Sequence, residues 1–247
     1  MQLVFLGTSG YHNTQRRETT CLMLPELGVV LDAGSGFARV RDWLATNELD
    51  VFLTHAHLDH CLGLTFLFTV LYGKEVTRTT VHGEASKLQS IREHLFHPDL
   101  FPVMPPLSWE ALSDSPLTLA SGAKLTWWPM EHPGGSLGYR IEWRERSLAF
   151  VTDTLADPAA KYVEHLRGVD LLVHECTFPD EHIELAEKSG HSCISAVAQV
   201  AKAAGVGRLI LTHVEPTVER EGLLDVGVAR AIFPRTELAE DGMVVEV

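Results

Sequence analysis

The chain has 247 residues, of which 45% are hydrophobic and 21% charged, and this is the composition of an ordinary globular protein. Its 33 acidic and 20 basic residues give a net charge of -13. That balance argues against a broad basic face that would hold nucleic acid or an anionic membrane. No Pro-, Gly- or Ser-rich linker interrupts the chain, so the sequence predicts a single domain over 1–247.

The N-terminus and the cysteines indicate the cellular setting. Residues 1–7 have the pattern of a strand and lack the basic start and cleavage site of a signal peptide. The longest apolar stretch, residues 62–72, is too short to span a membrane and predicts a buried helix. Four cysteines, Cys21, Cys61, Cys176 and Cys193, show no disulfide-type spacing. We therefore expect reduced, buried thiols and a cytoplasmic protein without a membrane anchor.

Short aliphatic runs bounded by turn residues predict strands along the whole chain. In chain order these cover 3–6, 20–24, 29–31, 51–54, 79–82, 124–128, 137–143, 147–152, 171–173 and 209–211. Helical spacing appears over 37–44, 84–95, 194–204 and 218–232, and Gly205 is a natural stop for the third of these helices. The Pro-rich segment 99–115 is expected to be irregular. Hairpins mixed with crossover helices predict an α/β protein.

Several predicted strands end in polar, chemically active residues. The strands lead into Asp32, Thr54-His55, Asp153, His174-Glu175 and His213. Strand ends are where a sheet presents reactive side chains to a shared crevice, so these residues are candidates for one site.

The run Thr54-His55-Ala56-His57-Leu58-Asp59-His60 is the strongest signal in the sequence. In an extended segment His55 and His57 point to the same side, so both can bind one ion. Asp59 and His60 then lie in the first turn of the next helix and can reach a second ion. Imidazole and carboxylate ligands without thiolate suit Zn, and also Mn or Fe.

This cluster resembles the H-x-H-x-D-H signature of the metallo-β-lactamase superfamily, and the later motifs of that family follow in order over the whole chain. The resemblance implies an αββα sandwich, with two mixed β-sheets packed face to face and helices on the outer faces. It implies two divalent ions per chain, with Zn the first choice. The implied metal ligands are His55, His57, Asp59, His60, His132, Asp153 and His213.

The resemblance also implies a role for individual residues. Asp32 would orient groups beneath the metal site, and His132 would be the third ligand of the first ion. Asp153 would bridge both ions, and His213 would be the last ligand of the second ion. The segments around His132 and Tyr139, around Glu175 and around His191 are similar to the Gly-Tyr-Arg strand and to the His-Glu-Ala-Thr and His-Ser-Thr boxes of ribonuclease Z and related phosphodiesterases.

The chemistry expected of such a site is attack on phosphorus by a hydroxide that bridges the metals. Asp59, Glu175 and His191 are the expected catalytic residues. Asp59 would orient the hydroxide, and His191, held by Glu175, would protonate the leaving group, because an imidazole beside a carboxylate is charged near neutral pH. The other histidines, His12, His82, His94, His97, His165 and His182, are expected to be structural or surface residues.

The chain departs from bacterial ribonuclease Z in one respect. That enzyme carries a long tRNA-gripping arm between the third-motif histidine and the bridging aspartate, whereas His132 and Asp153 are only 21 positions apart here. The phosphodiesterase of phosphonate breakdown also lacks the arm, but it has a Cys-rich metal loop near its N-terminus, where this chain has only Cys21. We therefore expect a small phosphodiester, a cyclic phosphate or an RNA end as substrate.

Three other functions stay open at this stage. One is a thioester or lactam hydrolase of the same fold, and another is a true tRNA 3'-processing endonuclease. The third is a scaffold that has lost its metals, which the filled ligand positions argue against. The sequence identifies neither the natural substrate nor the oligomeric state, and a homodimer is left open.

Overall fold

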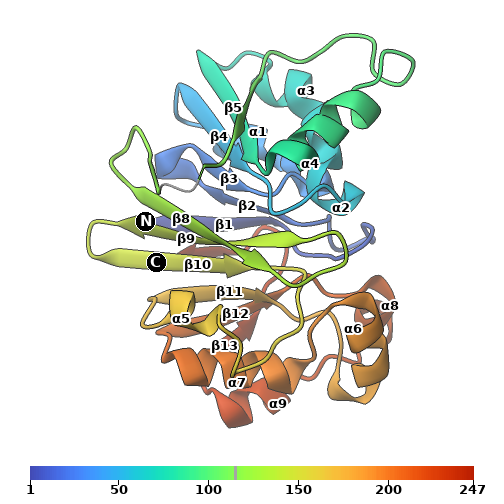
Figure 1. Ribbon diagram of the computed structural model, residues 1–247, viewed down its shortest axis with the longest axis vertical. Coiled ribbons are helices and arrows are strands. Elements are labelled where there is room, and N and C mark those ends of the chain that lie inside the picture. The colour runs from blue at the N-terminus through green and yellow to red at the C-terminus, as the bar shows by residue number, and fades with distance from the viewer. Residues whose placement is uncertain (114–115) are drawn as a thin grey trace. The chain divides into compact units, whose positions relative to one another are not determined.

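A computed structural model describes residues 1–113 and 116–247, and Figure 1 shows its elements. The chain divides into two compact units. The first contains the described residues up to 113 together with Glu240–Glu246, and the second contains those from 116 to 239 together with Val247. That all 247 residues form one domain stays a prediction. No helix in the described part of the chain is both long and apolar enough to cross a membrane.

The first unit is built on a seven-stranded mixed sheet with the order β14-β1-β2-β3-β4-β5-β6. Its strands are β1 (Gln2–Gly7), β2 (Cys21–Leu24), β3 (Val29–Leu31), β4 (Glu48–Phe52), β5 (Arg78–Gly83), β6 (Ser108–Ala111) and β14 (Val244–Glu246). Pairing is antiparallel from β14 to β3 and parallel from β3 to β6. The parallel strands β3, β4 and β5 therefore all end at the same edge of the sheet.

Short helices cover one face of this sheet. They are α1 (Val40–Trp43), α2 (Leu58–Cys61), α3 (Leu67–Leu71) and α4 (Ala85–Ser90), with 3-10 turns at Pro25–Leu27, Ser35–Arg39 and Leu62–Phe66 and a π-helical turn at Ile91–Leu95. Alternate strand residues such as Val4, Val30 and Val51 pack with Phe37 and Leu67 in one core. The other face is buried as well, as shown by Phe5, Leu22 and Phe52, which are fully buried. Burial on both faces explains why these strands are almost continuously apolar.

The second unit repeats this design in a sheet with the order β13-β12-β11-β10-β9-β8-β7. The strands are β7 (Leu117–Thr118), β8 (Lys124–Met130), β9 (Ser136–Trp143), β10 (Arg146–Val151), β11 (Leu171–Glu175), β12 (Arg208–Thr212) and β13 (Thr236–Leu238). Pairing is antiparallel from β7 to β10 and parallel from β10 to β13. Each unit thus joins an antiparallel half-sheet to a parallel one.

The helices of the second unit are α5 (Val163–Leu166), α6 (Ile183–Ser189), α7 (Ile194–Ala204), α8 (Pro216–Glu221) and α9 (Val226–Ile232), with a 3-10 turn at Asp180–His182. In Figure 1, α5, α7 and α9 lie along one face of the sheet, where Val197 and Ala201 of α7 pack against Leu172 and Leu209. The α7 helix ends at Gly205, whose φ of 62° is the left-handed conformation that glycine adopts without strain. The predicted α/β class and pair of mixed sheets are confirmed.

The predicted elements differ from the observed ones in a few places. Each predicted strand overlaps an observed one, but β6, β7, β13 and β14 were not predicted, and β6 lies inside the segment expected to be irregular. Residues 114 and 115 of that segment lie outside the described residues. The single helix predicted over 218–232 is two helices, because Gly222 ends α8 with a φ of 66°. The apolar stretch 62–72 is helical but only partly buried, and Tyr72 is 76% exposed.

Gly63 allows the 3-10 turn Leu62–Phe66 to pack closely against Gly34 and Phe37. A Cβ atom there would lie 2.1 Å from the Gly34 carbonyl oxygen and 2.5 Å from Cβ of Phe37. Overpacking of a well-packed core costs about 1–3 kcal/mol. We expect Gly63→Ala to lower the free energy of unfolding by at least that amount in a urea titration. Gly73→Ala is the control, since nothing lies within 4 Å of a Cβ there and only its positive φ of 71° opposes the change. Equal stability of Gly63→Ala and the unaltered protein would show that this close packing is not required.

Candidate metal centre

The candidate site residues follow the ends of parallel strands in both units. Asp32 follows β3, His55 follows β4, Asp153 follows β10 and His213 follows β12. Three of these, Asp32, Asp153 and His213, have positive φ angles of 60°, 48° and 60°. A non-glycine residue with positive φ is uncommon and usually strained. Strained residues of this kind often cluster at functional sites.

Asp32 is the buried centre of the first group. Its carboxylate accepts hydrogen bonds from the Thr54 backbone N–H at 2.7 Å and from Nδ1 of His60 at 2.8 Å. The Thr54 hydroxyl lies 2.9 Å from Asp32 Oδ2 and donates to it, so its oxygen can accept from Nδ1 of His55 at 3.0 Å. Asp32 therefore orients His60 directly and His55 through Thr54. This agrees with its expected role as an orienting residue.

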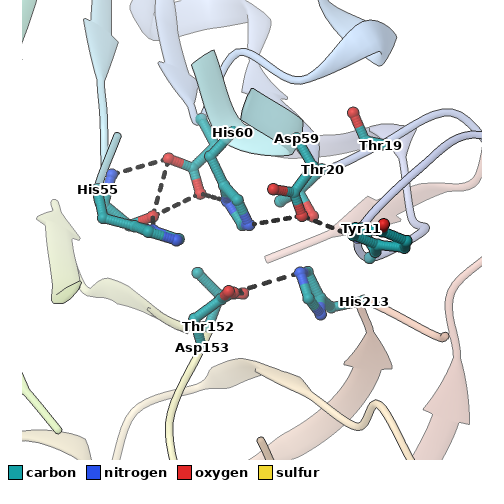
Figure 2. Close-up of polar contacts among 12 residues, drawn as sticks. Tyr11, Thr19, Thr20, His55, Asp59, His60, Thr152, Asp153 and His213 are labelled. Atoms are coloured by element: carbon teal, nitrogen blue, oxygen red, sulfur yellow. Dashed lines mark hydrogen bonds and ion pairs between the residues drawn. The ribbon is translucent and has the colours of Figure 1, made fainter. Parts of the chain in front are cut away.

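The four expected ligands of the first unit lie close together around the start of α2. The ring centroid of His55 is 4.3 Å from that of His57 and 4.3 Å from that of His60. Asp59 lies beside His60, with Oδ2 3.3 Å from Nε2 (Figure 2). His57 is the residue before the helix, and Asp59 and His60 occupy its single turn, as predicted.

The second unit brings His132, Asp153 and His213 together. Asp153 Oδ2 lies 3.5 Å from Nε2 of His132, and its Oδ1 lies 3.3 Å from Nε2 of His213, as Figure 2 shows for His213. All three side chains are 2% exposed. His132 donates from Nδ1 to the Gly190 carbonyl oxygen at 3.0 Å. Gly190 permits this close approach, because a Cβ there would lie 2.5 Å from Cδ of Pro133.

Glu175 is the buried centre of this second group. It accepts from Nδ1 of His191 at 3.0 Å and from the hydroxyl of Thr177 at 2.6 Å. The Thr177 oxygen lies 3.1 Å from Nδ1 of His213 and can accept from it. The backbone N–H groups of Thr154 and Ser192 also donate to Glu175, at 2.8 and 3.1 Å. Glu175 therefore orients His191 directly and His213 through Thr177.

The two units thus share one arrangement, in which a buried carboxylate holds one imidazole directly and a second through a threonine hydroxyl. In the first unit the carboxylate is Asp32 and the threonine is Thr54. In the second they are Glu175 and Thr177. Neither threonine was predicted to have a role. Their position one residue before His55 and two residues after Glu175 was the available signal, but threonine is common near strand ends.

The two buried carboxylates differ in their acidity. Burial raises the pKa of Asp32, against the charge and hydrogen bond of His60 and the hydrogen bonds of Thr54. Burial also acts to raise the pKa of Glu175, but the charge and hydrogen bond of His191 and the charge of His213 outweigh it and lower that pKa. Glu175 is therefore ionised near neutral pH and contacts Nδ1 of His191 as a carboxylate.

The donor atoms in each unit fit divalent transition metals. Four of the histidines, His55, His60, His132 and His213, use Nδ1 for a hydrogen bond, which leaves Nε2 as the coordinating atom. In the second unit, ligand atoms of Asp153, His191 and His213 lie within 4.8 Å of one another. Imidazole and carboxylate donors with a hydrogen-bonded support of this kind suit Zn, Mn and Fe. His191 belongs to this cluster, although its predicted role was proton transfer.

Thr177→Val offers a direct test of the threonine bridge. The change keeps the volume but removes the hydroxyl that joins His213 to Glu175. Loss of such a supporting hydrogen bond typically costs about 10- to 100-fold in metal affinity or activity. We expect this loss in a metal titration with a competing chelator. Thr177→Ser keeps the hydroxyl and should retain most of the affinity, whereas equal affinities for the two variants would contradict the bridge.

Comparison with known proteins identifies the family. Residues 28–214 match the profile described as a beta-lactamase superfamily domain. The chain belongs to the metallo-β-lactamase superfamily, and the resemblance predicted from the sequence is confirmed.

Among its relatives, the chain is 28% identical to ribonuclease Z of Nostoc sp., over 100% of this chain and 95% of the relative. It is 29% identical to ribonuclease BN of Escherichia coli, over 100% of both chains. Among solved structures, the metallo-β-lactamase fold protein YhfI of Bacillus subtilis superimposes with a TM-score of 0.80 at 20% identity, over 99% of each chain. This structural match confirms the fold.

The alignment with the Nostoc protein spans 319 positions, whereas this chain has 247 residues, a difference of 72. The relative therefore carries segments that this chain lacks.

Proposed function

We propose that the chain is a dinuclear metal-dependent phosphodiesterase of the ribonuclease Z-like branch. The observation that carries this proposal is the repeated arrangement of a buried carboxylate and two oriented imidazoles, one copy in each unit. Relatives named ribonuclease Z and ribonuclease BN over the whole length of the chain support the same class of hydrolase.

The proposed ligand sets divide seven residues between two ions. His55, His57 and His132 would hold the first ion, and Asp59, His60 and His213 would hold the second, with Asp153 shared by both. The seven ligands are imidazoles and carboxylates without a thiolate. Such ligands suit Zn, which is the first choice, and also Mn or Fe. When bound, two such ions lower the pKa of water and neutralise the charge that builds up on the phosphoryl oxygens.

The remaining chemistry belongs to the protein's own residues. Asp59 lies at the start of α2 with Oδ2 3.3 Å from His60 Nε2, where it can orient the attacking water. His191 is proposed as the proton donor to the departing oxygen, because Glu175 holds its Nδ1 and leaves Nε2 to carry the proton that is transferred. The negative charge of Glu175, which lies in a buried position, stabilises the protonated form of His191.

The proposed substrate is a small phosphodiester, a cyclic phosphate or an RNA end. A net charge of -13 leaves little basic surface for a long polyanion, and the 21-position spacing leaves no room for a tRNA-gripping arm. Relatives named ribonuclease Z and ribonuclease BN support RNA as a substrate, and a tRNA 3'-processing endonuclease remains the second candidate. A cytoplasmic location is also proposed, since all four cysteines are free and buried.

A substrate panel on metal-replete protein tests the function. We expect hydrolysis of bis(p-nitrophenyl) phosphate and of cyclic nucleotides, loss of that activity on chelation, and recovery on addition of Zn or Mn. The kcat/KM for a 3'-extended tRNA precursor should be lower than for the small phosphodiesters at near-physiological salt.

Two results of this panel would change the assignment. Efficient cleavage after the tRNA discriminator would identify the chain as the endonuclease. Another loop or a partner protein would then have to bind the tRNA. If the protein hydrolyses a thioester faster than every phosphodiester in the panel, the proposed function is wrong and the chain is a thioester hydrolase of the same fold.

A further inference from the structure

The loop between β1 and β2, residues 8–20, is held rigidly at its base. The backbone N–H groups of Thr8 and Ser9 both donate to the Glu18 carbonyl oxygen at 2.9 Å. Arg17 is 4% exposed and donates from Nη1 to the Thr8 hydroxyl at 2.5 Å. The Ser9 hydroxyl donates to the His12 carbonyl oxygen at 2.9 Å. The tip of the loop, residues 10–13, therefore has a defined position despite its exposure to solvent.

Tyr11 at this tip combines a strained backbone with an exposed ring. The His12 N–H donates to the Gly10 carbonyl oxygen at 2.7 Å, which closes a three-residue turn around Tyr11, and Tyr11 has a φ of 62°. Glycine adopts this conformation without cost, whereas a bulky aromatic residue does so only when something compensates for the strain. The Tyr11 side chain is nevertheless 78% exposed, so burial does not compensate.

The backbone of Tyr11 is tied to a proposed metal ligand. Its N–H donates to Asp59 Oδ2 at 2.8 Å, and Figure 2 shows Tyr11 beside Asp59. The ring also contacts His12 edge to face, with centroids 5.3 Å apart. These contacts hold Tyr11 beside the proposed ligand Asp59, with most of the residue exposed to solvent.

We propose that Tyr11 is a specificity residue that stacks on the base of the nucleotide next to the scissile phosphate. This inference rests on the proposed phosphodiesterase function. An exposed, preorganised aromatic ring is the feature that proteins use to bind bases irrespective of sequence. Stacking requires no positive charge, which suits a chain whose net charge is -13. The hydrogen bonds of the Tyr11 and His12 N–H groups hold the strained turn in the free protein, and the turn places Tyr11 beside the proposed metal ligand Asp59.

Two p-nitrophenyl esters with the same leaving group test the proposal. Thymidine 5'-(p-nitrophenyl phosphate) carries a base and methyl p-nitrophenyl phosphate does not. We expect Tyr11→Ala to lower the ratio of their kcat/KM values by about 5- to 150-fold, the range for one base–aromatic stack. The Tyr11 N–H is retained in this variant, so its bond to Asp59 is kept. Tyr11→Trp should restore the ratio. Tyr72→Ala, which removes a tyrosine that is 76% exposed and directly follows α3, is the matched control and should leave the ratio unchanged.

Equilibrium binding separates this proposal from the proposed function. On metal-replete protein, Tyr11→Ala should weaken binding of thymidine 5'-monophosphate by about 5- to 150-fold relative to methyl phosphate. The proposal is overturned if thymidine 5'-monophosphate and methyl phosphate lose affinity equally, or if neither affinity changes. If the unaltered protein binds the nucleotide through Tyr11 but hydrolyses neither ester, the phosphodiesterase assignment fails while the stacking role stands.

Discussion

Asp153→Ala is expected to lower kcat/KM for bis(p-nitrophenyl) phosphate by at least about three orders of magnitude, because bound metals supply several kcal/mol of transition-state stabilisation. The side chain is 2% exposed, and its two oxygens face His132 and His213 separately. The variant should also lose thermal stability in the presence of metal, since the ions bind only the folded state. At a free metal concentration about 100 times the dissociation constant, that stabilisation is about 2.7 kcal/mol.

The comparison that isolates metal binding is a melting curve with and without chelator. Asp153→Ala should melt at nearly the same temperature under both conditions, whereas the unaltered protein should lose stability on chelation. Asp157→Ala, at an exposed aspartate of the same unit, should behave like the unaltered protein. An Asp153→Ala protein that keeps its activity and both ions would show that the shared-ligand assignment is wrong.

His191→Ala should slow hydrolysis of an alkyl phosphodiester by about 10²- to 10⁴-fold, the usual contribution of a positioned general acid. The effect should be much smaller for a p-nitrophenyl ester, whose leaving group needs no proton. The structure supports this role through the 3.0 Å bond between Glu175 and Nδ1 of His191. Rates for an alkyl and a nitrophenyl ester, measured on the same preparations, check the prediction.

Metal content decides between the two roles that the geometry allows for His191. Its ligand atom lies within 4.8 Å of those of Asp153 and His213, so coordination is the alternative to proton transfer. A proton donor leaves the metal content unchanged when it is removed, and a ligand does not. If His191→Ala slows hydrolysis of both esters equally and the variant also lacks a bound ion, His191 is a metal ligand. His182→Ala, at a histidine in the Asp180–His182 turn, controls for loss of an imidazole from this unit.

The sequence predicted the ligand groups within each unit because their signals are local. His55, His57, Asp59 and His60 lie within six residues, and strand periodicity together with the start of α2 places them around one point. The buried strands could be predicted as well, because a strand that is buried on both faces appears in the sequence as a long aliphatic run. The strands that were not predicted, β6, β7, β13 and β14, have only two to four residues each and are partly exposed. The pairing of β14 also depends on β1, at the other end of the chain, whereas β7 pairs with the neighbouring β8.

The supporting network could not be predicted in the same way. Thr177 bridges Glu175 to His213, 36 residues further along the chain, and His132 bonds Gly190 across 58 residues. Such contacts depend on the three-dimensional path of the chain, and threonine and glycine occur at turns for many other reasons. The strained conformation of Tyr11 was hidden for the same reason, because nothing in the residue itself indicates a positive φ.

The hydrogen bonds to Asp32 and Glu175 also bear on how quickly the protein regains its ions after they are removed. Each carboxylate fixes its two imidazoles through contacts within its own unit, so the coordinating rotamers are set before any ion arrives. The ligand side chains then lose little conformational freedom when a metal ion binds, and this lowers the entropic cost of binding. Chelated protein should accordingly recover within the mixing time of a stopped-flow experiment, without a slow refolding phase, and repeated cycles of stripping and reloading should return the same specific activity.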